Sequence, residues 1–332
     1  MKIFRCFSFI VLLLVFGVTA LTGCEQNKNV KRIGIVLPIE HQALNEIANG
    51  FITTLQKLYH QPLEFKVVNA QGDMNMQRAI IEQMRDSNYA MIVPVSTSVT
   101  QMAVALAGQK PIVALAALYT EQNRRAQKSC NVAVVDDEID KSQVVAFMHK
   151  VYPDIKTLAL VHSAGDKIFP EVAAVKAAAK LYGIDVHAFM VTNLSELYTV
   201  GHAFPDSTQA IFMLKDNMIA SGIETLIAVA KTKKIPLITS DEATVAKGAS
   251  FALGVHEKQI GSEGAKLAVQ ILQGKSACQL PIVQMTNPTV FINSTALGIN
   301  NLEQQRIESI AAQLHFPVEI IKQPTQSAKK QG

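Results

Sequence analysis

The stretch RIGIVLPIEHQALNEIANGFITTLQKLY (32–59) decides the fold class of this chain. Its first part, RIGIVLP (32–38), is a short apolar run with β-branched residues, a pattern that predicts a buried strand. Apolar residues then recur at helical spacing, as at Leu44, Ile47 and Phe51, which predicts an amphipathic helix. A buried strand followed by such a helix is the repeating unit of α/β proteins.

The same unit recurs along the chain. Eight more apolar runs are expected to form strands: EFKVVNA (64–70), YAMIVPV (89–95), PIVALAAL (111–118), TLALVHS (157–163), DVHAFMV (185–191), QAIFMLKD (209–216), IPLITSD (235–241) and SFALGV (250–255). Amphipathic helical patterns separate most of these runs, which indicates parallel sheets covered by helices on both faces. We therefore predict an α/β fold with two halves, about 31–127 and about 131–253, joined by SCNVAVVDDEID (129–140).

More chain follows the second half, so the polypeptide can cross between the halves twice more. Two strand-like pieces, PIVQM (281–285) and TVFIN (289–293), close the core of this remaining part. We expect a lobe–hinge–lobe body with a ligand cleft between the lobes. Its expected divisions are 32–127 plus about 256–284 for lobe 1, 128–255 plus about 285–300 for lobe 2, and 301–332 for a C-terminal helix and flexible tail.

The N-terminus has the pattern of a signal peptide. Lys2 and Arg5 form a cationic start, and FIVLLLVFGVTAL (9–21) is an apolar core too short to remain as a permanent membrane span. Beyond this segment no apolar run has membrane-spanning length, so we expect a soluble body. The pattern predicts a protein that is exported from the cytoplasm.

LTGC (21–24) resembles the lipobox of bacterial lipoproteins. The resemblance implies that residues 1–23 are removed, that Cys24 carries the lipid, palmitate included, and that 24–31 is a tether. The protein would then be anchored to the membrane, inner or outer, and face the periplasm or the cell exterior, because several acyl chains anchor firmly. An ordinary signal peptide cut near Gly23 is the alternative.

Composition excludes several classes of protein. The chain has 31 Lys and Arg against 27 Asp and Glu, with no basic cluster of the kind that binds nucleic acid. No nucleophile–base pair, phosphate-binding glycine loop or metal-ligand cluster occurs, so we expect no enzyme, cofactor or metal site. Outside the signal and the lipidation site, Cys130 and Cys278 remain, either as a disulfide or as two buried free thiols.

Polar residues follow the predicted strands, where ligands bind in open α/β sheets. In the first half these residues are mainly hydroxyls and amides, and in the second half they include carboxylates. The candidates are Glu40, His41, Asn69, Ser96, Thr97, Ser98 and Ala117 in the first half, and Ser163, Asp216, Asn217, Ser240 and Asp241 in the second.

The two sets could bind opposite ends of a zwitterion. Ser96 to Ser98 lie at a predicted helix N-terminus, where free N–H groups and the helix dipole favour a carboxylate. Asp216 or Asp241 could hold an ammonium group by a charge-assisted hydrogen bond. The alternative is that Ser96 or Ser98, and both aspartates, only cap the helices that follow them.

Several segments together resemble the ABC-transporter substrate-binding protein family that includes tryptophan- and tyrosine-type binding lipoproteins. These segments are IGIVLPIEHQALNEIANGFITTL (33–55), VVNAQGD (67–73), the Ser/Thr-rich turn at 96–101, LKDN (214–217) and PLITSDEATVAKGASFALGV (236–255). The resemblance implies a type I periplasmic-binding-protein fold, two Rossmann-like lobes joined by a three-strand hinge. It also implies capture of a small solute, such as tryptophan, tyrosine or phenylalanine, for delivery to an ABC permease and its ATPase.

The resemblance implies a set of ligand contacts, which are Glu40, His41, Asn69, Ser96, Ser98, Asp216, Asn217, Ser240 and Asp241. At two places the chain departs from the family pattern. The fourth strand ends in Ala117-Leu118-Tyr119-Thr120 where the family has a small residue followed by Thr-Asp-Pro, and Tyr119 could stack on an aromatic ligand or simply pack. His162-Ser163-Ala164-Gly165-Asp166 replaces a Tyr-Asn…Asn-Ser turn, so the ligand's identity stays open.

An amino-acid-binding protein of an ABC importer is thus the function expected from the sequence. A ligand-sensing receptor on the same fold, signalling to a membrane partner, is the alternative. A transcriptional regulator with this fold would need an N-terminal DNA-binding helix-turn-helix, and here a signal peptide occupies that position.

Overall fold

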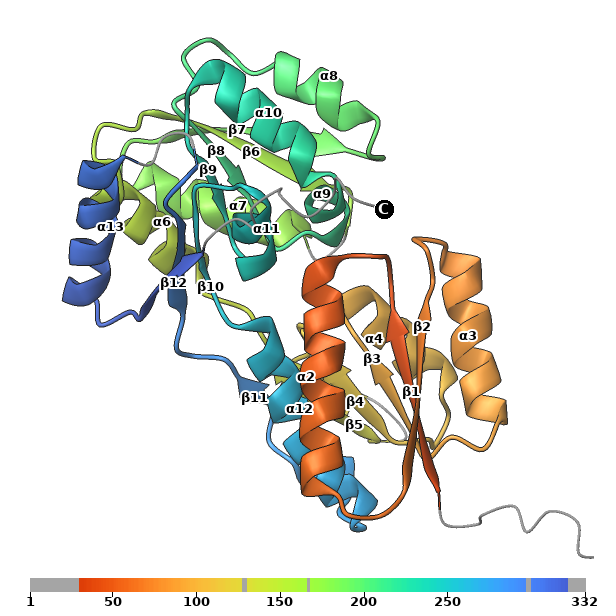
Figure 1. Ribbon diagram of the computed structural model, residues 1–332. Coiled ribbons are helices and arrows are strands. Elements are labelled where there is room, and N and C mark those ends of the chain that lie inside the picture. The colour runs from red at the N-terminus through yellow and green to blue at the C-terminus, as the bar shows by residue number, and fades with distance from the viewer. Residues whose placement is uncertain (1–29, 127–129, 166–167, 297–299, 322–332) are drawn as a thin grey trace, which may run out of the picture.

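The computed structural model describes residues 30–126, 130–165, 168–296 and 300–321 (Figure 1). The predicted signal peptide, the predicted lipidation site Cys24 and the predicted C-terminal tail QPTQSAKKQG (323–332) lie outside the described residues. The chain folds into two lobes, each built on one twisted sheet with helices on both faces. The α/β fold class predicted from the alternating pattern is confirmed.

The sheet of lobe 1 is entirely parallel, with strand order β11-β5-β4-β3-β1-β2. Its strands are β1 (Lys31–Leu37), β2 (Leu63–Asn69), β3 (Met91–Pro94), β4 (Ile112–Leu115), β5 (Val132–Asp136) and β11 (Val283–Gln284). The helices of this lobe are α2 (Gln42–Leu58), α3 (Met74–Asp86), α4 (Thr97–Leu106), α5 (Glu121–Arg125) and α12 (Glu257–Leu272), with the 3₁₀ turn η1 (Ala277–Gln279). Separate apolar clusters fill the two faces of the sheet, as expected for buried parallel strands.

The sheet of lobe 2 has the strand order β13-β12-β10-β9-β8-β6-β7. Its strands are β6 (Thr157–Ser163), β7 (Asp185–Val191), β8 (Ala210–Met213), β9 (Leu237–Thr239), β10 (Phe251–Gly254), β12 (Thr289–Asn293) and β13 (Val318–Ile321). The helices of this lobe are α6 (Lys141–Val151), α7 (Ile168–Lys180), α8 (Glu196–His202), α9 (Asn217–Ser221), α10 (Ile223–Lys233), α11 (Glu242–Lys247) and α13 (Asn301–Gln313). Again, apolar clusters cover both faces.

Three segments cross between the lobes, at 137–140, 255–256 and 285–288. They connect β5 to α6, β10 to α12 and β11 to β12. The third crossing enters lobe 2 at the edge from which β10 leaves it, and β12 therefore pairs antiparallel to β10 in an otherwise parallel sheet. β13 is parallel to β12, so both run opposite to the other strands of this sheet. The carboxyl ends of the remaining strands of both sheets face one another across the gap between the lobes.

Two details of the expected division need correction. The boundary at 127/128 would assign β5 to lobe 2, but β5 pairs with β4 in the sheet of lobe 1. Residues 301–332 were expected to hold one helix and then a flexible tail, QPTQSAKKQG (323–332), but between the two the short segment Val318–Ile321 pairs with β12 as an edge strand. For β5 the apolar pattern marks a strand without indicating which neighbour it pairs with, whereas β13 is a short, partly exposed edge strand that the pattern did not mark.

Helices α2 and α12 lie side by side and attach the second part of lobe 1 to its first part (Figure 1). A Cβ on Gly261 would lie 2.0 Å from the carbonyl oxygen of Ile47, and one on Gly50 would lie 2.3 Å from that of Lys258. The two backbones approach this closely only because both positions are glycine.

Cys130 and Cys278 are bonded in the structure, with their Cα atoms 5.5 Å apart. This separation lies in the usual range for a disulfide. The bond connects the segment before β5 to η1. The stretch of chain that it closes into a loop includes β5, the part of lobe 2 from α6 to β10, and α12.

Candidate ligand cleft

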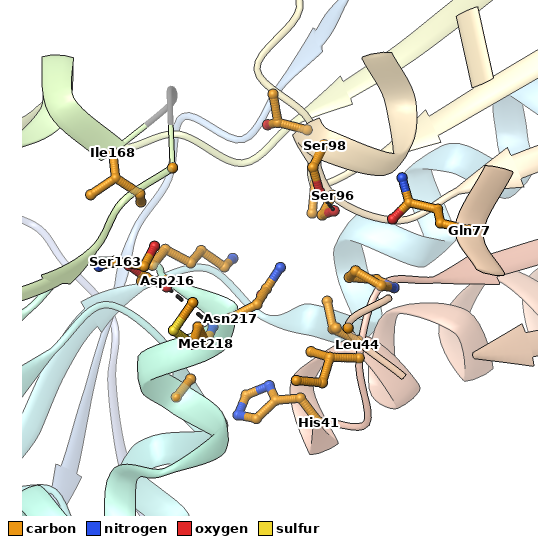
Figure 2. Close-up of a pocket in the computed structure, with 18 of the residues that line it drawn as sticks. His41, Leu44, Gln77, Ser96, Ser98, Ser163, Ile168, Asp216, Asn217 and Met218 are labelled. Carbon is orange, nitrogen blue, oxygen red and sulfur yellow. Dashed lines mark hydrogen bonds between the residues drawn. The ribbon is translucent and has the colours of Figure 1, made fainter. Parts of the chain in front are cut away.

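A cavity of about 710 Å³ lies between the lobes, at the carboxyl ends of the strands (Figure 2). Eight of the thirteen residues predicted to contact a ligand line it: His41, Ser96, Thr97, Ser98, Ser163, Asp216, Asn217 and Asp241. They come from both lobes, so a ligand in this cavity would touch both. A cavity of this size matches ordinary small-molecule sites.

On the lobe 1 side, the N-terminus of α4 faces the cavity. Ser96 is the N-cap residue, but its side chain makes no capping hydrogen bond. Its hydroxyl lies 3.3 Å from that of Ser98, while Thr97 Oγ1 accepts from Leu118 N–H and Thr100 donates to the carbonyl of Ser96. The alternative that the Ser96 side chain caps this helix is therefore wrong, and Ser96 leaves the first N–H groups of α4 uncapped.

The backbone at Ser96 supports a functional interpretation of this turn. Its φ is 93°, in the region that normally favours glycine. Strain of this kind at a non-glycine residue tends to occur at ligand-binding sites. Figure 2 shows Ser96 and Ser98 together at the lobe 1 edge of the cavity.

His41 is a buried histidine that lines the cavity from the start of α2. Its side chain is 4% exposed, and neither ring nitrogen has a hydrogen-bond partner within the described residues. Figure 2 shows the ring directed from lobe 1 towards the side of Asn217 and Met218. Burial lowers the pKa of His41 while the charge of Asp241 opposes this shift, so the imidazole is neutral near pH 7.

The two aspartates of lobe 2 differ in what their oxygens do. Asp216 caps α9: one oxygen accepts from Met218 N–H at 3.1 Å, and the other accepts from Ser163 N–H at 2.7 Å. Asp241 caps α11 with only one oxygen, which accepts from Thr244 N–H at 2.8 Å. In the part of the chain that the structure describes, the second oxygen of Asp241 makes no hydrogen bond, and this residue lines the cavity. Asp241 is therefore the better candidate for a cation, and Asp216 is mainly structural.

A buried ion pair lies between the hinge and lobe 2. Lys215, which follows β8, pairs with Asp137 of the first crossing segment, and both residues line the cavity. Burial acts to lower the pKa of Lys215, but the charge of Asp137 and its hydrogen bond with Lys215, together with the nearby carboxyl groups of Glu257 and Asp241, outweigh burial and raise the pKa. Lys215 thus stays charged and holds the first crossing segment against lobe 2.

Five predicted residues do not line the cavity. The Glu40 carboxylate accepts from Asn45 and Asn69, at 2.7 and 2.8 Å, and this cluster braces the turns after β1 and β2. Ser240 donates to the carbonyl of Met213. Ala117 and Tyr119 belong to the apolar cluster on one face of the lobe 1 sheet, so Tyr119 packs in the lobe rather than stacking in the cleft.

The sequence-based candidates omitted several residues that line the cavity. Gln77 and Met102 reach it from the flanks of α3 and α4, and Gln77 Nε2 lies 3.4 Å from the Met102 sulfur. Leu44 and Met218 contribute apolar surface from the two lobes. These side chains lie within helices and not directly at the end of a strand. The rule that ligands bind at strand ends therefore could not find them. Counting one helical turn at a time from each helix N-terminus could have identified them.

Neither a metal-binding cluster nor a membrane-spanning helix is found among the described residues. They contain no group of three or more His, Cys, Asp or Glu side chains that could hold a metal ion. Within the same ranges, none of the helices is long and apolar enough to cross a membrane.

Comparison with known proteins agrees with this geometry. The model of the ABC transporter substrate binding protein family matches residues 32–313. An uncharacterized protein of Rickettsia prowazekii is 34% identical over 289 residues, covering 87% of this chain and 89% of the relative. A tyrosine-binding protein of Clostridioides difficile is 25% identical over 321 residues, covering 89% of this chain and 92% of that protein.

Solved structures share the fold. The structure of an ABC domain from Streptococcus pneumoniae in complex with L-Trp matches with a TM-score of 0.74 and 22% identity, covering 86% of this chain and 94% of that one. Further neighbours are solute-binding proteins with the type I periplasmic-binding-protein fold, which this chain shares. Proteins of this kind are extracytoplasmic, bind small molecules for ABC transporters and are not enzymes. The chain belongs to the ABC transporter substrate-binding protein family.

Proposed function

We propose that this protein captures a zwitterionic amino acid, aromatic by preference, and delivers it to an ABC importer. The ligand would bind in the cavity between the lobes and draw them together about the three crossing segments. The observation that carries the proposal is the pairing of an uncapped helix N-terminus on lobe 1 with a free carboxylate oxygen on lobe 2.

The lobe 1 side suits the carboxylate of an amino acid. The free N–H groups of α4 and the helix dipole favour an anion, and the hydroxyls of Ser96 and Ser98 can donate to it. In this role the Ser/Thr-rich turn would serve the ligand rather than the helix.

The lobe 2 side suits the ammonium group. Asp241 is 2% exposed, lines the cavity and has a second oxygen that its helix cap does not use, so an ammonium bound to that oxygen would form a charge-assisted hydrogen bond shielded from water. Asn217, which also lines the cavity, could accept a further hydrogen bond from the same group.

The side chain of the ligand would lie on apolar surface. Leu44, Met102, Ile168 and Met218 line the cavity, and thioether sulfurs make favourable contacts with aromatic rings. The tyrosine-binding and L-Trp-bound relatives support an aromatic ligand.

A thermal-shift screen of the purified protein against the twenty amino acids tests the proposed ligand class. A ligand at about 100 times its dissociation constant stabilises the folded protein by roughly 2.7 kcal/mol, which is easily measured. We expect the largest shift with tryptophan, tyrosine or phenylalanine. The absence of a shift with every amino acid would reject the proposal.

The same proposal includes lipid anchoring at Cys24, which rests on the lipobox-like LTGC. Cells expressing the full chain can be labelled with a palmitate analogue and fractionated. The unaltered protein should carry label and sediment with membranes, whereas Cys24→Ala should be unlabelled. Equal labelling of both would remove Cys24 as the anchor.

A further inference from the structure

A second carboxyl group lies buried behind Asp241, at the point where the chain returns to lobe 1. Glu257 is the first residue of α12, directly after the second crossing segment, and is 2% exposed. One of its oxygens accepts from the backbone N–H of Glu242, the residue that follows Asp241, at 3.2 Å. The end of the hinge and the ligand-facing carboxylate are therefore neighbours.

The charges around Glu257 do not balance if it is ionised. Lys215 acts on it favourably, but Lys215 is already paired with Asp137 and also acts on Asp241. Burial, and then the charge of Asp241, raise the pKa of Glu257 well above its ordinary value, with Glu242 adding to the rise. In the empty protein, burial and the neighbouring carboxylate of Asp241 therefore favour the protonated form of Glu257.

The remaining charged groups around Glu257 do not supply a counterion. His256, beside it in the chain, pairs with Glu242 at 3.2 Å and with Glu319 of β13 at 3.6 Å. From α2, which packs along α12, Glu46 pairs with Lys258 at 3.3 Å. Lys258 is thus already paired with a carboxylate, and both ring nitrogens of His256 lie beside carboxylates other than Glu257.

The buried side chain of His41 is an independent sign that a polar ligand belongs here. It is more than nine-tenths buried, lines the same cavity and has no hydrogen-bond partner within the described ranges. Burying an imidazole without a partner is unfavourable, so a ligand group is expected to complete it. Because the ring is neutral, it does not replace the missing cation.

We propose that Asp241 and Glu257 form a proton-linked cation subsite, in which a ligand ammonium bound at Asp241 displaces the proton of Glu257. The O–H bond of the Glu257 carboxyl breaks, the proton passes to the buffer, and the ligand stays fully protonated. The proposal rests on the proposed function, since it needs a ligand with an ammonium group. Glu257 is a positioning residue here, acting through Asp241.

Two consequences can be measured. Binding releases up to one proton per ligand, and the dissociation constant falls by up to tenfold per pH unit as the pH rises towards the pKa of Glu257 in the empty protein. Above that pKa the affinity becomes independent of pH. A subsite of permanently ionised carboxylates would show neither effect.

Isothermal titration calorimetry tests the proposal on the unaltered protein. L-tryptophan, L-tyrosine and L-phenylalanine are titrated at pH 6.5 to 8.0 in phosphate and in Tris, two buffers that differ strongly in their enthalpy of protonation. We expect the binding enthalpy to differ between the buffers in the direction that corresponds to net release of a proton. Binding with the same enthalpy in both buffers would overturn the proton linkage but not the proposed function. Absence of binding by all three would overturn both.

Two variants locate the proton. Glu257→Gln should bind without proton release and with an affinity that no longer changes with pH. His256→Gln, the matched neighbour, should release the proton as the unaltered protein does. Proton release that persists in Glu257→Gln, or disappears in His256→Gln, would contradict the assignment to Glu257.

Discussion

The two walls of the cleft present opposite charge by different means. On lobe 1 the positive potential comes from the backbone of α4, with hydroxyls around it. On lobe 2 and the hinge it is side chains, Asp241 above all, that supply the negative charge. If the proposed function holds, the anion is recognised on lobe 1 by backbone groups that any sequence with this fold supplies, whereas the cation is recognised on lobe 2 mainly by the side chain of Asp241. Substitutions on the two walls should therefore differ in effect.

Asp241→Asn should have the largest effect on binding. The amide keeps the shape and can still accept from Thr244 N–H, but it removes the charge that faces the ligand. We expect the dissociation constant to rise at least about 100-fold, or roughly 2.7 kcal/mol, with little change in thermal stability. Calorimetry gives the first quantity and a melting curve without ligand the second. Affinity within threefold of the unaltered protein would exclude Asp241 from the site.

Asp216→Ala sharpens the contrast within lobe 2, because Asp216 caps α9 and also anchors Ser163. Loss of a cap and of a buried hydrogen bond should destabilise the protein by about 2 kcal/mol. The matched control is Asp73→Ala, which removes an exposed cap of α3 and should cost only about 1 kcal/mol. The comparison is made by urea unfolding, and equal losses in the two variants would contradict the structural role of Asp216.

Ser98→Asp tests the lobe 1 wall. A carboxylate at the start of α4 should stabilise the helix by about 0.5 kcal/mol while it competes with the ligand carboxylate. We expect about tenfold weaker binding, or roughly 1.4 kcal/mol, whereas the uncharged control Ser98→Asn should stay within threefold. If both variants bind equally well, the ligand's anionic end lies elsewhere.

His41→Gln should have the smallest effect, which appears in the pH dependence of stability. Because burial lowers the pKa of His41, the unfolded chain binds a proton more readily than the folded protein does. The free energy of unfolding therefore decreases as the pH falls below about 6.5, by at most about 1.4 kcal/mol per pH unit. His41→Gln should flatten this part of the curve, while substitution of the exposed His60 should leave it unchanged. If stability depends on pH as steeply in His41→Gln as in the unaltered protein, His41 is not the cause of this dependence.

Much of the fold follows from the pattern of the sequence. The apolar runs and helical spacings predict the β1–α2 unit and its repeats, because burial on both faces leaves a clear signature. The same pattern could not assign β5 to lobe 1, since it shows that a strand is buried and not which strand it pairs with. It could not identify β13 either, because this edge strand is partly exposed and lacks the apolar run of a buried strand.

The candidate site, like the fold, could be predicted from the sequence only in part. The rule that ligands bind at strand ends brought eight candidates to one cavity, including His41 and Asp241. It could not separate Asp241 from Asp216, because both follow a strand and differ only in the partner of the second oxygen. Nor could it find Gln77, which reaches the cavity from the flank of a helix.

The central claim is that the two walls bind the two charged ends of one ligand. Binding of L-tryptophan should therefore be compared with that of tryptamine, which lacks the carboxylate, and indole-3-propionate, which lacks the ammonium group. Calorimetry under identical conditions should show binding of L-tryptophan and at least 100-fold weaker binding of both analogues. Binding of either analogue as tightly as L-tryptophan would contradict the claim.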